Sequence, residues 1–486
     1  MPTSPTLSKT RYERLLRPLR DRLLDAQFRL VQSKASAVAV ILTGVPGAGR
    51  SESIGELLEW MDPKFIAVHA YGRQASQSEG RPALWRFWQD LPAKGRLGLF
   101  FGAWYEDWAF RQSRHKLTTR ESHRRVSASI KQLEGMLVRD GVRVLKIHLH
   151  VPRDVQRKRL RKLTASALTR WRVTREDRWM AAHAGRVDAA FSRSIKATTT
   201  LAAPWHELDA SDVQHRSIAV GRLVLSALEQ ACKADALKER PVRTRPRSGA
   251  LKPFARRQRP PLEEEAYEQE LLVQQARLAR LARKQPFLKR GAVIVVEGMD
   301  AAGKGGAIRR LVHALDPRQY QVIPVSAPTP EERLYPYLWR FWRNLPGRGS
   351  FAVFDRSWYG RVLVERVRGF AAARDWRRAF DEINEFESQL AEHGLVVCKF
   401  WLDVSSEVQL ARFLERDANP LKRFKVDPED WINRDHFAAY RTAAAEMIRL
   451  TDRPQAPWNV VDADDKYRAR LAVLGAVAGA IERALD

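Results

Sequence analysis

The chain has 486 residues, 44% of them hydrophobic and 29% charged, and its formal net charge is +28. This length predicts two or more domains, each able to bury a core, and no apolar stretch is long enough to span a bilayer, which excludes an integral membrane protein. The excess of Lys and Arg indicates a polyanionic partner, which could be nucleic acid, an anionic membrane surface or inorganic polyphosphate, unless it reflects only solvated arginine-rich surfaces.

The remaining global features predict a cytoplasmic protein. Residues 1–11 contain no apolar signal segment, and the two cysteines, Cys232 and Cys398, lie too far apart in sequence to form a metal-ligand pair. We therefore expect reduced thiols and a reducing compartment.

The sequence is an internal duplication. Pro82-Ala-Leu-Trp-Arg-Phe-Trp88 recurs 254 residues later as Pro336-Tyr-Leu-Trp-Arg-Phe-Trp342, and Trp205 recurs as Trp458 at an offset of 253. A period this long indicates two copies of a whole domain. We predict a first domain over 1–232, a Pro- and Arg-rich linker over 233–262 that could also touch a polyanion, and a second domain over 263–486.

Both copies begin with an amphipathic segment, over 12–32 and 263–284. In the second copy, strands and helices then alternate. The expected strands are 293–297, 322–325, 351–355, 396–402 and 459–461. The expected helices are 307–315, 331–342, 359–367, 375–393, 407–416, 434–450 and 466–485. This alternation predicts a parallel sheet covered on both faces, and hence two tandem three-layer α/β/α domains of the P-loop-kinase type.

A glycine-rich turn follows the first strand of the second copy. It reads Glu297-Gly-Met-Asp-Ala-Ala-Gly-Lys-Gly-Gly306 and leads into a helix, so its backbone N–H groups and the helix dipole should hold phosphate. Lys304 adds a full positive charge. The usual hydroxyl after this lysine is replaced by Gly305, and Asp300 is the natural substitute as an oxygen ligand for Mg²⁺. A tight turn without a ligand is the alternative.

The first copy has lost these groups. Asp300 corresponds to Pro46, Lys304 to Arg50, Asp355 to Phe101 and Arg356 to Gly102. Phenylalanine cannot bind a metal, so we predict that the first copy is inactive, although Arg50 could still hold an anion weakly.

These motifs resemble those of the family-2 polyphosphate kinases, and the duplicated layout resembles their two-domain branch, the polyphosphate:AMP phosphotransferases. The motifs that carry the resemblance are 297–306, 354–366, 383–387 and the basic, lid-like segment 416–425. The Gly-Arg-Val-Leu-Val that follows Tyr359 is similar to the branch that phosphorylates nucleoside monophosphates. Phe424 stands where many relatives carry tryptophan.

The resemblance implies transfer of a phosphoryl group from polyphosphate to AMP, giving ADP, with Mg²⁺ as cofactor. The residues suit that chemistry independently, because phosphoryl transfer requires positioning and charge neutralisation. We assign the catalytic roles to Asp300, Lys304, Asp355 and Arg356, and the Mg²⁺ ligands to Asp300 and Asp355, although Asp355 could instead cap a helix. The phosphate-binding residues would be Gly298, Ala301, Ala302, Gly303, Gly305, Gly306, Arg309, Arg416, Lys422, Arg423 and Lys425. The nucleotide-binding residues would be Asp355, Ser357, Trp358, Tyr359, Arg361 and Glu365.

Several alternatives remain open at this stage. Residues 416–425 would form a helical lid that excludes water, or an exposed basic loop. Trp358 and Tyr359 could stack on a base, but their recurrence in the inactive copy favours core packing. The rival functions are an ATP-dependent nucleotide or small-molecule kinase and a non-enzymatic polyanion-binding protein. We expect a homo-oligomer with polyphosphate and AMP or ADP as partners and no membrane contact; nucleic acid is disfavoured, since a polyanion binder gains nothing from the two carboxylates.

Overall fold

The computed structural model describes residues 7–71, 80–114, 119–233, 260–418 and 428–486. They form two compact units, the first built mainly from residues before the predicted linker and the second mainly from residues after it. Residues 329–339 group with the first unit and residues 80–85 with the second. Among the described residues, no helix is long and apolar enough to cross a membrane.

The second unit is built on the predicted parallel sheet, in the strand order β10-β9-β6-β8-β7. Its strands are β6 (Gly291–Gly298), β7 (Tyr320–Pro324), β8 (Phe351–Asp355), β9 (Leu395–Asp403) and β10 (Trp458–Asp462). Every residue of β9, and all but the last of β6, is buried, as expected of strands covered on both faces.

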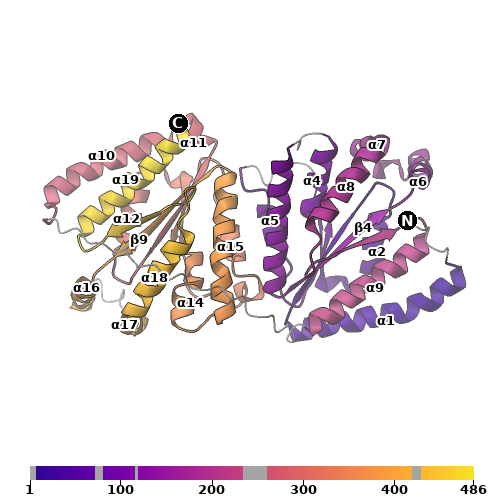
Figure 1. Ribbon diagram of the computed structural model, residues 1–486, viewed down its shortest axis with the longest axis horizontal. Helices are drawn as coiled ribbons and strands as arrows, with labels where there is room; N and C mark the ends of the chain where they lie inside the picture. Colours follow the sequence, from indigo (N-terminus) through magenta and orange to yellow (C-terminus); the bar gives the residue numbers. More distant parts are fainter. Residues whose placement is uncertain (1–6, 72–79, 115–118, 234–259, 419–427) are drawn as a thin grey trace. The chain divides into compact units, whose positions relative to one another are not determined.

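Helices cover both faces of this sheet, which confirms the three-layer prediction (Figure 1). One face carries α10 (Glu264–Ala282), α12 (Lys304–Val312) and α19 (Lys466–Leu485). The other carries α15 (Ala373–Glu392) and α18 (Phe437–Thr451). The glycine-rich turn lies between β6 and α12, at the carboxyl edge of the sheet, where ligands of open α/β folds bind.

The first unit repeats this architecture. Its strands are β1 (Ala37–Gly44), β2 (Ile66–Ala70), β3 (Leu97–Phe101), β4 (Val142–His150) and β5 (Trp205–Asp209), in the order β2-β3-β1-β4-β5. That order is equivalent to the order in the second unit. The helices α1 (Lys9–Ser33), α2 (Arg50–Trp60) and α9 (Val213–Cys232) cover one face, and α5 (Arg120–Arg139) and α8 (Ala184–Thr198) cover the other (Figure 1).

Three predicted helices are wrong, because the structure has two shorter elements in place of each of them. The segment 331–342 contains η6 (Glu332–Leu334) and α13 (Trp339–Arg343), because Pro336 lacks an N–H and keeps the residue before it extended. The segment 359–367 divides into η7 (Trp358–Arg361) and α14 (Val364–Val367) at Leu363, which leaves helical geometry. The last, 434–450, comprises the end of α17 (Pro428–Asp435) and most of α18, separated at His436.

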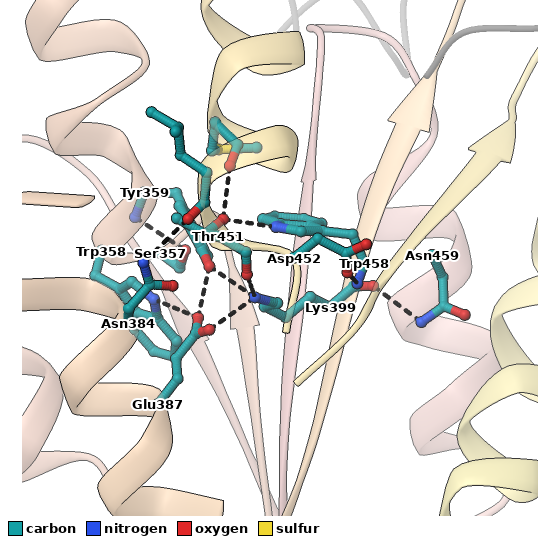
Figure 2. A network of polar contacts seen from close by, with 12 residues as sticks. Ser357, Trp358, Tyr359, Asn384, Glu387, Lys399, Thr451, Asp452, Trp458 and Asn459 are labelled. Atoms are coloured by element: carbon teal, nitrogen blue, oxygen red, sulfur yellow. Dashed lines mark hydrogen bonds and ion pairs between the residues drawn. The ribbon is translucent and has the colours of Figure 1, made fainter. Parts of the chain in front are cut away.

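A buried polar network joins the sheet of the second unit to its helices (Figure 2). Lys399 on β9 lies with its Nζ 2.7 Å from Glu387 Oε2 and donates to the carbonyl of Thr451 at 2.8 Å. Glu387 Oε1 accepts hydrogen bonds from Tyr359 Oη at 2.7 Å and Trp358 Nε1 at 3.0 Å. Each polar atom at the centre of the network therefore has a partner, as burial requires.

The first unit contains the same network at the equivalent positions. Lys146 lies 2.7 Å from Glu134 and donates to the Thr198 carbonyl at 2.8 Å. The Glu134 carboxylate accepts hydrogen bonds from Trp104 and Tyr105. Since the first copy lacks the predicted catalytic groups, the network belongs to the scaffold rather than to catalysis.

Candidate active site

The glycine-rich turn has the geometry of a phosphate-binding loop. Gly298 closes β6 with φ +151°, and a Cβ there would lie 2.6 Å from the carbonyl oxygen of Leu402, so only glycine fits. Gly303, with φ +101°, caps the start of α12. The first N–H groups of α12 have no partner within the helix and are available to an anion.

Lys304 is the first residue of α12 and bends back over the loop. Its Nζ donates to the carbonyl oxygens of Gly298 at 2.9 Å and Met299 at 3.0 Å, and lies 3.9 Å from Asp300 Oδ1. Burial and the neighbouring Arg356 lower the pKa of Lys304, while Asp300 and Asp355 act in the opposite direction. Lys304 therefore interacts electrostatically with both predicted metal-binding carboxylates.

Asp300 is held from two sides. Arg356 Nη2 donates to its Oδ1 at 2.6 Å, and Asn433 Nδ2 donates to its Oδ2 at 2.9 Å. Burial acts to raise the pKa of Asp300, but Lys304, Arg356 and the hydrogen bond from Asn433 outweigh it, so the pKa lies below the ordinary value. Asp300 is thus a carboxylate at neutral pH.

Two residues of this site hold a backbone conformation that side chains disfavour. Ala301 has φ +60° and Arg356 has φ +63°. The equivalent positions in the first copy are Gly47 and Gly102, with φ +80° and +81°, where glycine removes the penalty of roughly 1–2 kcal/mol. The second copy keeps a strained arginine, and strain of this kind concentrates at functional sites. The second copy therefore retains a cation at position 356 despite the backbone strain.

Glu297 adds a third carboxyl group that the sequence analysis quoted in the loop motif but did not assign. It is 4% exposed and accepts a hydrogen bond from Ser357 Oγ at 2.8 Å. Burial raises the pKa of Glu297 to about 7, although Ser357 and Lys304 oppose the shift. The group is therefore partly protonated at neutral pH.

A cavity opens beside these groups and is lined by both predicted and unpredicted residues. Of the predicted ones, Gly298, Asp300 and Arg356 line it. The others are Glu297, Met299, Gly360, Leu363, Val364, Trp401, Gln409, Asn433 and Tyr440. The cavity therefore exposes the Asp300–Arg356 pair to a ligand.

The other predicted charged residues lie in several places. Asp355 ends β8 beside Val296 of β6, close to the loop. Arg361 and Glu365 form an ion pair at 3.0 Å. Arg309 is exposed on α12. Arg416 is partly buried near the end of α16 (Ser406–Ala418). Lys422, Arg423 and Lys425 lie outside the described residues, as does most of the predicted lid.

Trp358 and Tyr359 do not face the cavity. Both side chains are buried and bind Glu387 in the core network (Figure 2). This placement agrees with the core-packing alternative, and their predicted contact with a nucleotide stays a prediction.

A magnesium ion would find a suitable pair of ligands at this edge. Across the described parts of the chain, no group of three or more His, Cys, Asp or Glu side chains is arranged to hold a metal. Mg²⁺, however, is commonly bound by one or two carboxylates together with substrate phosphates and water. Asp300, in the turn after β6, and Asp355, at the end of the adjacent strand β8, have the carboxylate chemistry that this mode requires.

Asn433 is the main residue that sequence reasoning missed. Its Oδ1 accepts from Arg368 Nη1 and from Tyr440 Oη, both at 3.1 Å, so it links two helices to Asp300. The duplication held a signal: at the same offset, Asn433 corresponds to Met180 and Tyr440 to Val187. Met180 and Val187 belong to the hydrophobic core of the first unit. Apolar side chains therefore fill the equivalent junction of the first copy. The polar side chains at this junction, Asn433 and Tyr440, occur in the copy that contains Asp300.

In the first copy, the residue equivalent to Lys304 is neutralised within the protein. Arg50 is 7% exposed, lies 3.0 Å from Glu106 and packs over the ring of Phe101 at 4.3 Å. Glu106 stands where the second copy has Gly360, a residue that lines the cavity. The Glu106 carboxylate thus pairs with Arg50 and competes with any phosphate for this cation.

Comparisons with known proteins find matches over both copies. Two stretches of the chain, 6–236 and 261–485, match the family model of polyphosphate kinase 2. The chain is 40% identical to a polyphosphate:AMP phosphotransferase of Pseudomonas aeruginosa, over 99% of this chain and 97% of the relative. It is 35% identical to one of Acinetobacter johnsonii, over 94% of each.

A solved structure from Pseudomonas aeruginosa, assigned to polyphosphate kinase 2, has the same fold over nearly the whole length. The TM-score is 0.86 at 39% identity, and the match covers 99% of this chain and 97% of that one. Both copies, the fold and the sequence thus point to the same group of proteins, and the chain belongs to the polyphosphate kinase 2 family.

Proposed function

We propose that the second unit transfers a phosphoryl group from inorganic polyphosphate to AMP and so forms ADP, with Mg²⁺ as cofactor. The observation that carries the proposal is the ion pair of Asp300 and Arg356 beside Lys304, at the carboxyl edge of the sheet and open to the cavity. Relatives that match nearly the full length of the chain are named polyphosphate:AMP phosphotransferases, which supports the choice of donor and acceptor.

The charges of the site suit this reaction. The transition state spreads negative charge over the oxygens of the transferring phosphoryl group, and Lys304 and Arg356 would neutralise it. Asp300 and Asp355 would hold Mg²⁺, which supplies charge compensation between donor and acceptor phosphates when bound. Arg416 and the cations at 422, 423 and 425 would bind the polyphosphate chain. Ser357, Arg361 and Glu365 would position the nucleotide.

A donor-swap assay tests this function. The protein is incubated with AMP and Mg²⁺, and with either polyphosphate or ATP, and ADP formed from labelled AMP is measured. We expect ADP with polyphosphate as donor. Transfer from ATP without use of polyphosphate would favour the rival nucleotide kinase, and tight binding of polyphosphate without any transfer would favour a non-enzymatic binding protein.

Asn433 gives a prediction specific to this site. Asn433→Met installs the residue of the first copy and removes the hydrogen bond to Asp300 Oδ2, which leaves that carboxylate held by Arg356 alone. We expect ADP formation to fall by about 10- to 100-fold, since small displacements of positioned groups cost that much. The midpoint of urea unfolding should fall only slightly, because Tyr440, which loses its acceptor, lines the cavity, where water can replace that acceptor.

The reverse substitution in the first copy, Met180→Asn, is the matched control and should leave the rate of ADP formation unchanged. A kcat for Asn433→Met equal to that of the unaltered protein would show that Asn433 does not position Asp300. The cytoplasmic location, the homo-oligomer and the domain boundaries at 232 and 263 stay predictions.

A further inference from the structure

Helix α6 of the first unit carries many more cations than its equivalent in the second unit. α6 (Arg153–Ala165) contains six Arg or Lys residues and a single acidic one, Asp154. Its equivalent, α16, contains two arginines and three acidic residues. Both helices belong to one chain, so a general preference for arginine in this protein does not explain the difference. The positive charge is specific to the copy without the catalytic groups.

Five of the six cations lie on one exposed side of α6. These residues, which we call the α6 face, are Arg153, Arg157, Lys158, Arg161 and Lys162. Their spacing of four and five residues places them along one side of a helix, over a length of about 14 Å. The sixth, Arg159, points to the loop and donates to the carbonyl of Gly47 at 2.9 Å. The α6 face is thus available to a ligand, while Arg159 has a structural role.

The chain after α6 continues the cationic surface. Arg170 and Arg172 are exposed in η3 (Arg170–Arg172), and between them Trp171 is 72% exposed. Arg170 and Arg172 correspond to Arg423 and Lys425 of the basic segment in the second copy. The first copy therefore keeps cations of the predicted lid although it has lost the residues equivalent to Asp300 and Lys304.

We propose that the α6 face, together with Arg170 and Arg172, is a second binding site for inorganic polyphosphate, one that holds the chain without acting on it. The proposal rests on the proposed function in taking polyphosphate as the substrate. A row of exposed cations with little aromatic surface suits a polyanion that has no bases. Binding of single-stranded nucleic acid normally adds several aromatic platforms for base stacking, and this surface exposes one, Trp171. We expect no transfer in this copy, because it lacks the equivalents of Asp300, Asp355 and Arg356 and because Arg50 is paired with Glu106.

The test compares two triple variants that remove the same charge from different places. The first is Arg157→Gln with Lys158→Gln and Arg161→Gln, on the α6 face. The control is Arg11→Gln with Arg14→Gln and Arg17→Gln, three exposed arginines of α1. Both are made in protein that also carries Lys304→Ala, so that binding is measured without turnover. Binding of long-chain polyphosphate is followed by equilibrium dialysis at several salt concentrations.

We expect the α6 variant to lose on the order of 10-fold in affinity, with a shallower dependence on salt, because fewer counterions are released on binding. The α1 control should bind as the Lys304→Ala protein does. Equal affinities for the two triple variants would overturn the proposal. Single-stranded DNA that binds more tightly than polyphosphate, and loses that binding with the α6 substitutions, would assign the face to nucleic acid and overturn it as well.

Kinetics with the catalytic lysine intact separate this inference from the proposed function. The α6 variant should raise KM for long-chain polyphosphate and leave kcat and the KM for tripolyphosphate unchanged, since a short donor does not need a second site. An equal rise in KM for both donors would contradict the proposal. If polyphosphate is not a donor at all, the proposed function fails, whereas the dialysis experiment still reports on the α6 face.

Discussion

Lys304→Ala is expected to abolish most of the transfer of phosphate to AMP. The substitution removes the cation at the first position of α12, whose Nζ lies over the loop, and leaves Asp300 with one fewer cationic neighbour. Removing one preorganised group that stabilises developing charge typically costs about 100- to 1000-fold in kcat, and we expect at least that. The measurement is the rate of ADP formation from polyphosphate and AMP at saturating Mg²⁺.

The equivalent substitution in the first copy is the control. Arg50→Ala removes a cation at the same place in the fold, but that cation is paired with Glu106 and has no equivalent of the Asp300–Arg356 pair beside it. We expect most of the activity to remain. Full activity of Lys304→Ala, or a comparable loss in Arg50→Ala, would mean that the second copy is not the site of transfer. Circular dichroism of both variants verifies that they are folded.

Lys399→Met is expected to give the largest loss of stability in the second unit. It removes the partner of Glu387 at a place where neither side chain is more than 2% exposed, and leaves a carboxylate buried without its counter-charge. Breaking one side of a buried ion pair costs about 3–5 kcal/mol in the free energy of unfolding. Urea unfolding, followed by tryptophan fluorescence and by loss of ADP formation, measures the change.

Two further variants make that result interpretable. In Lys399→Met with Glu387→Gln, the lone buried charge is gone, so part of the lost stability should return. Lys146→Met breaks the same pair in the first unit and should destabilise that unit without changing kcat while the protein is folded. If Lys399→Met unfolds at the same urea concentration as the unaltered protein, the network does not stabilise the fold.

Much of the fold was predictable because the strands are short apolar runs bounded by clear turns. β8 agrees with the predicted strand at both ends, and α19 with the predicted helix. The errors fall where periodicity continued through a break. Pro336 interrupts one predicted helix for a reason visible in the sequence, whereas no proline marks the breaks at Leu363 and His436, next to helices α14 and α18, which pack against each other.

The site was predictable to the extent that its residues lie in one motif. The glycine-rich turn placed Asp300 and Lys304 together, and Arg356 follows a strand that ends at the same edge. Asn433 lies 133 residues from Asp300 and was missed, because a lone asparagine on a helix carries no local signal of a long-range contact. Trp358 stood out by its residue type, yet its indole serves the core.

The pairing of Arg50 with Glu106 bears on any attempt to make the N-terminal half a working enzyme. Exchanging Pro46, Arg50, Phe101 and Gly102 for their counterparts would restore the missing charges but leave the Glu106 carboxylate beside them. That side chain would compete with an incoming phosphate from inside the protein. A design with two competent halves must therefore also include Glu106→Gly, which installs the glycine that lines the cavity of the second copy.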